Sequence, residues 1–533
     1  MSPTNPAKVA DPVSLASAEH ELHEFLCDQS EWFMSEDGRS PVEVNRSELD
    51  FSVTHGRLIF SCWTERGSRA WRITAWNWSG DKVLLRASRR MGAEVTTIEL
   101  VPRASAKALV ASIAAARQAR CERVARIVAQ TLVCDDSGED HRLKSVPPAK
   151  TERAVLSPGM RRDQPGRYAR IILRLPHERV AVTATVAQSN PRNVDSLFSS
   201  ALLWFARVQA SPKRPSIARL LMVVEHDVLE AARQRHVLLR ESLRQQIELF
   251  EIDEKWQTAG ATRSWERKYL WRKRLSRFPP VHDDELSNRV QQIVAEAPEA
   301  VDVVSARHGQ TLRFHGLPFA RVRRVMDRDR VWFGIEGSRR RSLDEYHQRD
   351  WIKLLRDLQT YRAESCRDRR HWFYRAAGEA WLESILRRDI SRLDPGLIVA
   401  PLHAQFRTSH GGAIRTGGAR PIDLLALRHD GRLVVIELKV NEDREHVFQG
   451  VDYWRRVEAH RRRGHISAAE LFGEREISDE SPLVYLVAPA LRFHPSFATL
   501  AKTIAPDIEI YRFDINEDWR AGVRVVRRER VNG

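Results

Sequence analysis

Two apolar stretches near the C-terminal end of the chain constrain its fold most strongly, because each carries charged residues. One reads PIDLLAL and contains Asp423, and the other reads RLVVIELKV and contains Glu437 and Lys439. Side chains alternate between the faces of a strand, so Glu437 and Lys439 share one face while Ile436 and Leu438 enter the core from the other. Burying a carboxylate and an ammonium group is costly unless they are paired or bind a metal ion. The short turn RHDG predicts that the two strands pair antiparallel and bring Asp423 beside Glu437.

These three side chains have the chemistry of a metal-dependent hydrolase. Two carboxylates that converge on one point bind Mg²⁺ or Mn²⁺ well, since hard cations prefer oxygen ligands. A neighbouring lysine can orient a water molecule and stabilise developing negative charge. Asp423, Glu437 and Lys439 are therefore candidate active-site residues for the hydrolysis of a phosphodiester.

The elements around these residues follow an αβββαβ order. Apolar periodicity and turn residues predict helices over 371–390 and 444–463, and strands over 396–408, 421–427, 432–440 and 482–489. A further helix is expected over 493–504, and a final strand over 508–513. The C-terminal third is therefore predicted to be an α/β domain of its own.

Pro421-Ile422-Asp423 followed by Glu437-Leu438-Lys439 resembles the PD-(D/E)xK motif of restriction-endonuclease-like nucleases, whose core has the same αβββαβ order. Pro-Ile-Asp stands where the name of the motif has Pro-Asp. On the next helix, Gln449 and Tyr453 share a face. They resemble the QxxxY signature of the RecB-like branch, which includes mismatch-specific endonucleases of the EndoMS type. The resemblance covers roughly residues 371–515.

The resemblance implies a deoxyribonuclease that depends on Mg²⁺ or Mn²⁺, an endonuclease of repair or defence. It implies that Asp423, Glu437 and the carbonyl of Leu438 ligate the metal, and that Lys439 positions the water. It also implies that Gln449 orients active-site groups or DNA. An acidic residue of the first core helix completes the family pattern, from two candidates: Glu379, which we prefer, and Glu383.

Two other classes of function stay open on the sequence alone. The chain can be a non-catalytic nucleic-acid-binding or scaffolding protein, in which Glu437 and Lys439 form only an ion pair. It can also be a nuclease subunit that acts only in a larger assembly. Loss of metal binding on Asp423→Ala separates the first alternative from an enzyme.

Several basic residues near the motif are candidates for contact with nucleic acid. A run of arginines on the helix of Gln449 suits a phosphate backbone, though it also suits an ordinary solvated helix face. Arg415 lies in a Gly-rich loop that is either a substrate-contacting loop or a plain hairpin. The candidate nucleic-acid-binding residues are Tyr453, Arg415, Arg455, Arg456 and Arg462. His403 and His410 are interpreted as structural or exposed residues rather than ligands.

The net charge of +16 suits a polyanionic partner, DNA before RNA, although an Arg-rich composition alone gives the same excess. No run of about 18 apolar residues is present, so no membrane partner is expected. The five cysteines show no CxxC spacing, which favours a reducing, cytoplasmic compartment. A homodimer or protein partners are left open.

The fold class expected for the whole chain is multidomain α/β. We expect a β-rich domain with a helix over 1–134, a middle α/β domain over 150–260, a linker with helices and short strands over 261–365, and the nuclease domain over 366–533. The acidic segment DDSGEDH between the first two domains is interpreted as a solvated loop. The basic and aromatic segment 262–278 either binds nucleic acid or, as we favour, packs its aromatic residues on a neighbouring domain.

Residues 168–252 repeat the strand and helix rhythm of the C-terminal domain. Aligning Arg179 with Arg432 places Ala184 opposite Glu437 and Val186 opposite Lys439. One hypothesis is an internal duplication whose first copy is a nuclease-like domain that lost its catalytic groups. The alternative is that two unrelated α/β units share a rhythm.

Overall fold

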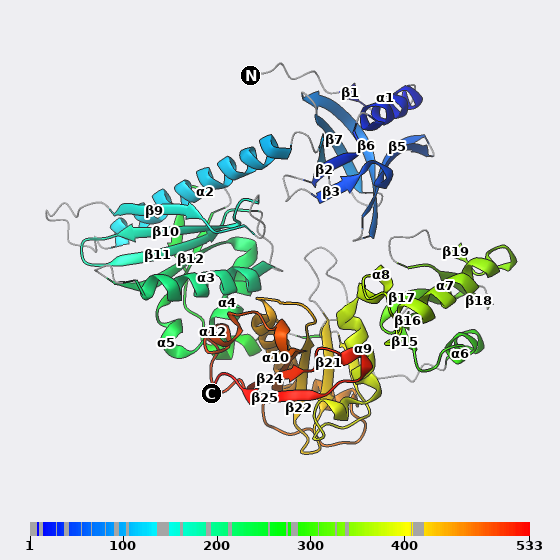
Figure 1. The fold of residues 1–533 in the computed structure, drawn as a ribbon. Helices are drawn as coiled ribbons and strands as arrows, with labels where there is room; N and C mark the ends of the chain where they lie inside the picture. Colours follow the sequence, from blue (N-terminus) through cyan, green and yellow to red (C-terminus); the bar gives the residue numbers. More distant parts are fainter. Residues whose placement is uncertain are drawn as a thin grey trace.

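The structure is a computed structural model. The residues that it describes are 8–9, 14–27, 29–36, 42–54, 56–64, 67–79, 82–89, 95–102, 106–135, 149–159, 164–187, 193–211, 216–253, 256–272, 275–278, 286–306, 309–325, 328–335, 341–406, 408 and 421–533. Within these ranges the chain is a multidomain α/β protein with four separate sheets (Figure 1). None of the helices in these ranges is both long and apolar enough to cross a membrane.

The first sheet is antiparallel, as the β-rich pattern near the N-terminus predicts. Its strand order is β3-β2-β8-β7-β6-β5-β4, with β1 paired to β6. Helix α1 (Leu15–Cys27) covers it with Leu15, Leu22 and Leu26, which are spaced to share one helix face. The strands are β1 (Lys8–Val9), β2 (Glu31–Glu36), β3 (Val42–Asn45), β4 (Leu49–Thr54), β5 (Arg57–Thr64), β6 (Gly67–Ser79), β7 (Lys82–Arg89) and β8 (Val95–Pro102).

Helix α2 (Ala106–Asp135) belongs to the second sheet and not to the first. The sequence grouped this helix with the N-terminal strands, and the structure corrects that boundary. Its buried residues Cys121, Val124 and Val128 pack in one cluster with strands of the middle unit. Helical periodicity shows which face of a helix is apolar, but it does not show which sheet that face covers.

The middle sheet has six strands in the order β14-β13-β12-β11-β10-β9. Its elements are β9 (Lys150–Leu156), β10 (Tyr168–Arg174), β11 (Arg179–Thr185), α3 (Val194–Gln209), β12 (Ile217–Glu225), α4 (His226–His236), α5 (Glu241–Arg244), β13 (Ile247–Ile252) and β14 (Ala259–Ala261). Strand β9 lies within the expected range of the middle domain, at its start. Most of the acidic segment DDSGEDH lies outside the described residues.

The region 261–365 is a folded unit rather than a linker. Five antiparallel strands form a sheet with its own apolar core around Phe319 and Trp351, whose rings stack at 5.7 Å. Its elements are α6 (Asn288–Ala295), β15 (Val301–Ala306), β16 (Gly309–Phe314), β17 (Leu317–Val325), β18 (Arg328–Phe333), β19 (Arg341–Ser342) and α7 (Gln348–Tyr361). Before it, the short helix η4 (Arg267–Trp271) packs Trp271 against Trp454, 6.3 Å away, as the favoured interpretation of 262–278 predicts.

The C-terminal unit contains the expected elements in the expected order. They are α8 (Trp372–Arg375), α9 (Gly378–Arg388), β20 (His403–Phe406), β21 (Ile422–Leu427), β22 (Leu433–Leu438), α10 (His446–Arg461), α11 (His465–Ala468), β23 (Leu483–Pro489), α12 (Phe497–Ala501), β24 (Ile510–Ile515) and β25 (Val525–Arg530). The expected first helix is broken at Ala377, whose φ is 45°. Only four residues of the long expected first strand are a strand, and β25 was not expected.

The middle and C-terminal sheets have the same topology. From β9 and from β20, the neighbour pairs run antiparallel, antiparallel, parallel, parallel and antiparallel. A helix that precedes the strands, α2 or α9, covers one face of each sheet. Helices α3 and α4 cover the other face of the middle sheet. In the C-terminal unit, α10 and α12 cover the corresponding face. The duplication hypothesis therefore survives a comparison strand by strand.

Hydrogen bonds across two hairpins fix how the units correspond residue by residue. The Leu175 N–H donates to the Glu178 carbonyl, and the Arg428 N–H donates to the Arg432 carbonyl. The first residues of β11 and β22 therefore correspond. In this register Val182 and Ile436 correspond, and both face the preceding helix of their unit, α2 or α9.

This register corrects the sequence alignment by one residue. The alignment placed Ala184 and Val186 opposite Glu437 and Lys439, but a slip of one residue turns every side chain to the wrong face of the sheet. The corresponding pairs in the structure are Thr183 with Glu437, Thr185 with Lys439, and Arg170 with Asp423.

The two units meet around a local two-fold axis. Leu239, after α4, and Ile504, after α12, form an antiparallel bridge with each other. The Arg240 N–H donates to the Thr503 carbonyl at 2.8 Å, and the Ala505 N–H donates to the Leu238 carbonyl at 3.0 Å. The two bonds are reciprocal, which is the pattern of an isologous interface. Helices α3, α4, α10 and α12 share one apolar core across this contact.

Candidate active site

The end of the β21–β22 ladder places Asp423 beside Glu437. Backbone pairing of the two strands stops at Leu424 and Ile436. One residue further on, Asp423 Oδ2 accepts a hydrogen bond from the Leu438 N–H at 2.9 Å. The aspartate side chain thus replaces the next rung of the ladder, and its carboxylate is fixed against the strand that carries Glu437.

Glu437 and Lys439 form a buried pair on one face of β22. Lys439 Nζ donates to Glu437 Oε1 at 2.6 Å, and the two residues are 9% and 2% exposed, respectively. The other oxygen, Glu437 Oε2, is buried and receives no hydrogen bond from a donor group among the described residues, and the Glu437 carboxyl group contacts that of Asp423. Burial, reinforced by repulsion from Asp423, raises the pKa of Glu437 well above its usual value against the attraction of Lys439.

Lys439 stays cationic because several carboxylates surround it. Burial alone would lower the pKa of this lysine, but Glu437, Glu379 and Asp423 together hold it above its usual range. A buried ammonium group fixed in this way provides a positive charge at the end of β22. The site therefore combines crowded negative charge with one oriented cation.

Of the two acidic residues on the first core helix, the structure brings Glu379 to the site. Burial raises its pKa, and Lys439, Asp423 and Asp443 are the charges that act on it most strongly. The approach of α9 is close, since a Cβ on Gly378 would lie 2.9 Å from Val440 Cγ2. Glu383 is also buried but points elsewhere, 3.9 Å from Arg313.

Gln449 and Tyr453 line the same site from α10. Gln449 Nε2 donates to Asp443 Oδ2 at 3.4 Å. Tyr453 is buried, and burial followed by the charge of Glu437 raises the pKa of its hydroxyl. The helix lies close to the sheet at Gly450, where a Cβ would come within 2.5 Å of Leu486 Cδ2. Tyr453 is therefore a buried neighbour of Glu437 and not an exposed nucleic-acid contact.

Two residues of the site were not singled out by the sequence. Asp443 Oδ2 lies 3.9 Å from Lys439 Nζ, and its other oxygen accepts the Glu445 N–H at 2.7 Å. The His446 Nε2–H donates to the Glu437 carbonyl at 3.2 Å, and burial, together with Lys439, lowers the pKa of this histidine to about 3. Asp443 follows the strand in the polar run NEDRE, which resembles any solvated turn, and no spacing rule marks His446.

The expected arginine stripe on α10 is not an open surface. Asp452 binds Arg455 at 2.7 Å and Arg456 at 3.2 Å, and it also accepts Arg235 of the middle unit at 2.6 Å. Arg455 and Arg456 are thereby held in a network between the two units. This corrects the expectation of a solvent-facing phosphate contact, which overlooked the carboxylate on the same helix turn.

Further along α10, Glu458 is fully buried and pairs with Arg461 and Arg462. Arg463 donates to the backbone carbonyl of Trp271. Arg462 keeps 51% of its side chain exposed, with its guanidinium 4.9 Å from the centre of the Trp271 ring.

The remaining sequence candidates lie apart from this cluster or outside the described residues. Arg415 and His410 belong to residues that the structure does not describe. His403 donates from Nε2 to the Leu471 carbonyl, and burial lowers its pKa, so its role is structural as expected.

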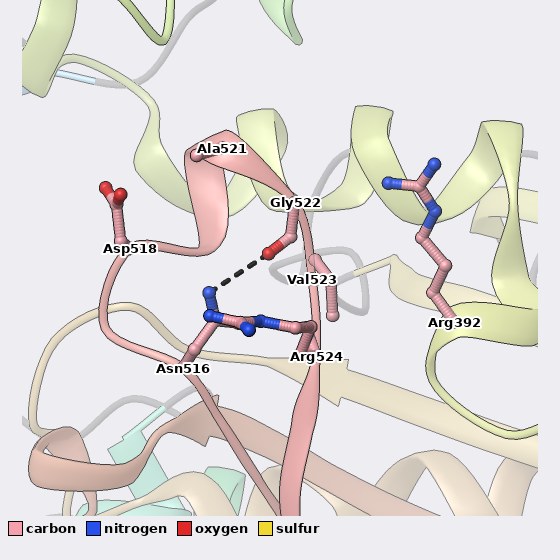
Figure 2. Close-up of a pocket in the computed structure, with 7 residues that line it drawn as sticks. All are labelled: Arg392, Asn516, Asp518, Ala521, Gly522, Val523 and Arg524. Carbon is pink, nitrogen blue, oxygen red and sulfur yellow. Dashed lines mark hydrogen bonds between the residues drawn. The ribbon is translucent and has the colours of Figure 1, made fainter.

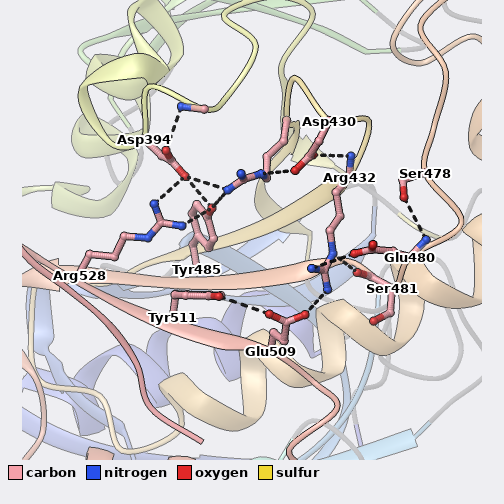
Figure 3. Close-up of polar contacts among 12 residues, drawn as sticks. Asp394, Asp430, Arg432, Ser478, Glu480, Ser481, Tyr485, Glu509, Tyr511 and Arg528 are labelled. Atoms are coloured by element: carbon pink, nitrogen blue, oxygen red, sulfur yellow. Dashed lines mark hydrogen bonds and ion pairs between the residues drawn. The ribbon is translucent and has the colours of Figure 1, made fainter. Parts of the chain in front are cut away.

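A second polar cluster lies at the opposite end of the same strands. Asp394 accepts the Tyr485 hydroxyl at 2.6 Å and lies 3.4 Å from Arg528 (Figure 3). Nearby, Arg432 binds Glu509 at 2.5 Å. Arg432 precedes β22, whereas Glu437 lies at the end of that strand. These contacts fasten the starts of the parallel strands and leave the other ends available for the candidate site.

A cavity of about 360 Å³ lies beside the last turn of the chain and does not include the candidate site (Figure 2). It is lined by Arg392, Asn516, Asp518, Ala521, Gly522, Val523 and Arg524. Hydrogen bonds between its lining residues include one from the Asn516 side chain to the Gly522 carbonyl at 3.0 Å and one from the Arg524 N–H to Asn516 Oδ1 at 2.9 Å. None of these lining residues belongs to the candidate active site.

The donor set at β21 and β22 fits one cation held by two side chains. In the part of the chain that the structure describes, no three His, Cys, Asp or Glu side chains come together closely enough to hold a metal ion. Asp423 and Glu437 are two carboxylates, so a backbone carbonyl such as that of Leu438 has to complete the protein ligands. The buried Glu437 Oε2, which receives no hydrogen bond among the described residues, is the observation that a bound cation would fit.

Comparison with known proteins adds no relative. No protein-family model matches the sequence, and a search of curated proteins finds no match.

Proposed function

We propose that this chain is a metal-dependent nuclease that hydrolyses phosphodiester bonds in DNA. Its C-terminal unit would be a restriction-endonuclease-like αβββαβ core of the PD-(D/E)xK type. One observation carries the proposal: two carboxylates, Asp423 and Glu437, crowd together at a strand end beside Lys439, and one buried carboxylate oxygen receives no hydrogen bond from any donor that the structure describes. A fold alone would not support an activity, because folds host many functions.

The residues divide into three tasks. Asp423, Glu437 and the Leu438 carbonyl would hold Mg²⁺ or Mn²⁺, which when bound supplies a Lewis acid and lowers the pKa of water. Lys439 would orient the attacking water and stabilise negative charge on the phosphate. Gln449 and Glu379 would position these groups, with Asp443 linking Gln449 to Lys439.

We further propose that the middle unit is an inactive copy of the same fold. It has Thr183 and Thr185 in place of Glu437 and Lys439, and Arg170 in place of Asp423. An arginine at the position of a metal-binding carboxylate repels a cation, so this copy would hold no metal.

The test compares cleavage of circular and linear DNA, single-stranded and duplex, with Mn²⁺ or Mg²⁺, for the wild type and Lys439→Ala. We expect cleavage by the wild type only, and cleavage of the circles would show an endonuclease. Cleavage that persists in Lys439→Ala would refute the assignment. Calorimetric titration with Mn²⁺ of the wild type and of Asp423→Ala tests the metal site without any substrate.

The buried Lys439–Glu437 pair also supports a second candidate, a non-catalytic nucleic-acid-binding or scaffolding protein. That pair satisfies one carboxylate oxygen without a metal ion. A wild type that binds DNA but takes up no Mn²⁺ would favour this candidate. Activity that appears only with co-purifying proteins would instead favour a subunit of a larger assembly.

A further inference from the structure

Arg170 lies where the C-terminal unit has its first carboxylate. It lies on β10, on the face covered by α3, together with Tyr168 and Ile172. It is partly buried, and among the described residues no carboxylate forms an ion pair with it. A charged group in such a place is uncommon, because burial without a partner costs free energy.

Three other arginines surround it. Arg170 pairs with Val155 across the ladder, so Arg153 is its diagonal neighbour on the same face, at roughly 7–8 Å. Arg207 belongs to α3, which covers that face, and Arg444 comes from the loop between β22 and α10. The pKa of Arg170 is lowered to about 10, first by burial and then by the charges of Arg207, Arg444 and Arg153.

None of these arginines is neutralised within the part of the protein that is described. Arg153, Arg207 and Arg444 are exposed, and none of them forms an ion pair with a described carboxylate. The repulsion that these three arginines exert on Arg170 adds to the cost of its partial burial. Such an arrangement is typical of a functional site, whose ligand supplies the missing charge.

Arg444 connects this cluster to the candidate active site. Ser199 Oγ of α3 donates to the Arg444 carbonyl at 3.4 Å, which holds the loop on the middle unit. The adjacent residue, Asp443, lies 3.9 Å from Lys439 Nζ. The arginine cluster and the carboxylates are therefore neighbours across the contact between the two units.

We propose that Arg153, Arg170, Arg207 and Arg444 form a binding site for the phosphates of a nucleic-acid backbone. The choice of DNA as the polyanion rests on the proposed nuclease function. Guanidinium groups suit this ligand, because their planar fork donates two hydrogen bonds to one phosphate. Such contacts set the position of the backbone and do not read its sequence. The inactive copy thereby holds the strand that the other copy cuts.

The test is DNA binding without metal, measured by fluorescence anisotropy of labelled oligonucleotides in EDTA. Arg207→Gln/Arg444→Gln removes two exposed charges, and we expect binding about tenfold weaker with a salt dependence lower by roughly 0.7–0.9 per lost contact. The matched control is Arg349→Gln/Arg356→Gln, two exposed arginines of α7. An equal loss in both variants would overturn the site and leave only a general charge effect. Equal competition by polyglutamate of the same charge would overturn the preference for phosphate.

A second variant separates binding from folding. Arg170→Gln removes the repulsion at the centre of the cluster, so we expect an unchanged or higher Tm together with weaker DNA binding. Unchanged binding in both Arg170→Gln and the double variant would overturn the proposal, as would a wild type without affinity for DNA. If the wild type binds DNA through these arginines but never cleaves it, the nuclease function is refuted and the arginine binding site is kept. If the wild type cleaves DNA and the arginine substitutions leave its binding unchanged, the arginine site is refuted and the nuclease is kept.

Discussion

The middle and C-terminal units have the same strand order and the same strand directions, yet they differ at the point where chemistry is expected. In the C-terminal unit the strand end carries a glutamate whose second carboxylate oxygen is buried and receives no hydrogen bond within the described parts of the chain. At the corresponding position, Thr183 is 2% exposed and donates its hydroxyl to the Ala169 carbonyl at 3.0 Å. One fold thus supports a polar position whose hydroxyl is hydrogen-bonded within the sheet and another where, in the proposed function, a metal ion would supply the missing contact.

The comparison of the two units separates residues that build the sheet from residues that are candidates for acting on a substrate. The apolar residues beside these positions play the same part in both units, since Val182 and Ile436 both pack toward the preceding helix. The polar residues differ in charge, and a buried carboxylate carries a larger desolvation cost than a buried hydroxyl that is hydrogen-bonded.

The largest difference between the units is expected in cleavage. Asp423→Asn keeps the shape of the side chain but removes a negative charge from the metal site, so we expect the cleavage rate to fall by about 10³–10⁴-fold, or about 4–5.5 kcal/mol. Thr183→Val in the middle unit is the matched change, and it should alter the rate less than about twofold. Rates measured on a supercoiled plasmid with Mn²⁺ decide this. Equal losses in the two variants would erase the distinction between the copies.

The next largest effect concerns the contact that joins the units. Asp452→Asn leaves Arg235, Arg455 and Arg456 without their shared carboxylate, so we expect the free energy of unfolding to fall by about 3 kcal/mol. Urea unfolding followed by tryptophan fluorescence measures it. Asp195→Asn, which removes a carboxylate from Arg235 alone, should cost less. A larger loss from Asp195→Asn would mean that Arg235 is held mainly by its own unit.

Metal binding should stabilise only one of the two units. Mn²⁺ at ten times its dissociation constant should raise the free energy of unfolding by about 1.4 kcal/mol, because the cation relieves the repulsion between Asp423 and Glu437. Differential scanning fluorimetry would show this as a higher Tm, absent in Asp423→Ala. Arg170→Asp should not create a second metal-dependent shift, since Thr183 supplies no carboxylate. A full shift in Asp423→Ala would place the metal elsewhere.

The smallest effect is the pH dependence of the contact between the units. Burial opposes ionisation of Asp452, but Arg235, Arg455 and Arg456 prevail and lower its pKa below the usual value. The contribution of Asp452 is therefore fully present above the pKa of an unfolded aspartate, about 3.9, and it is lost as the pH falls through the lower native pKa. The difference in unfolding free energy between the wild type and Asp452→Asn should stay constant from about pH 7 to 5, and shrink by up to about 1.4 kcal/mol per pH unit below 4. A difference that shrinks already near pH 6 would point to a histidine instead.

The site was largely visible in the sequence, because charges on an apolar strand have few explanations. Asp423, Glu437 and Lys439 stand out for that reason, whereas helix spacing reduced the acidic partner only to Glu379 or Glu383. The choice between those two depends on how α9 approaches β22, which is a tertiary fact. The active-site roles of all these residues stay predictions.

Other expectations failed where local patterns do not specify partners. The α10 arginines pair with Asp452 and Glu458 one turn away, and an excess of positive charge in the sequence hides that pairing. The alignment of the units slipped by one residue because the two hairpins differ in length: one closes between Leu175 and Glu178, the other between Arg428 and Arg432. The third sheet is hard to predict from the sequence because its strands, such as β17 and β18, mix apolar residues with several arginines.

The reciprocal hydrogen bonds around Leu239 and Ile504 have a consequence for how substitutions act on the contact between the two units. In a dimer of identical chains, every codon is expressed on both sides of such a contact, so a substitution always acts twice. Here each side has its own codon, and the halves can change one at a time. One half can exchange an acid for an arginine while its counterpart keeps the acid. If the proposed sites are right, the molecule thereby has a direction: a nucleic acid laid across it would meet arginines on one side and carboxylates on the other.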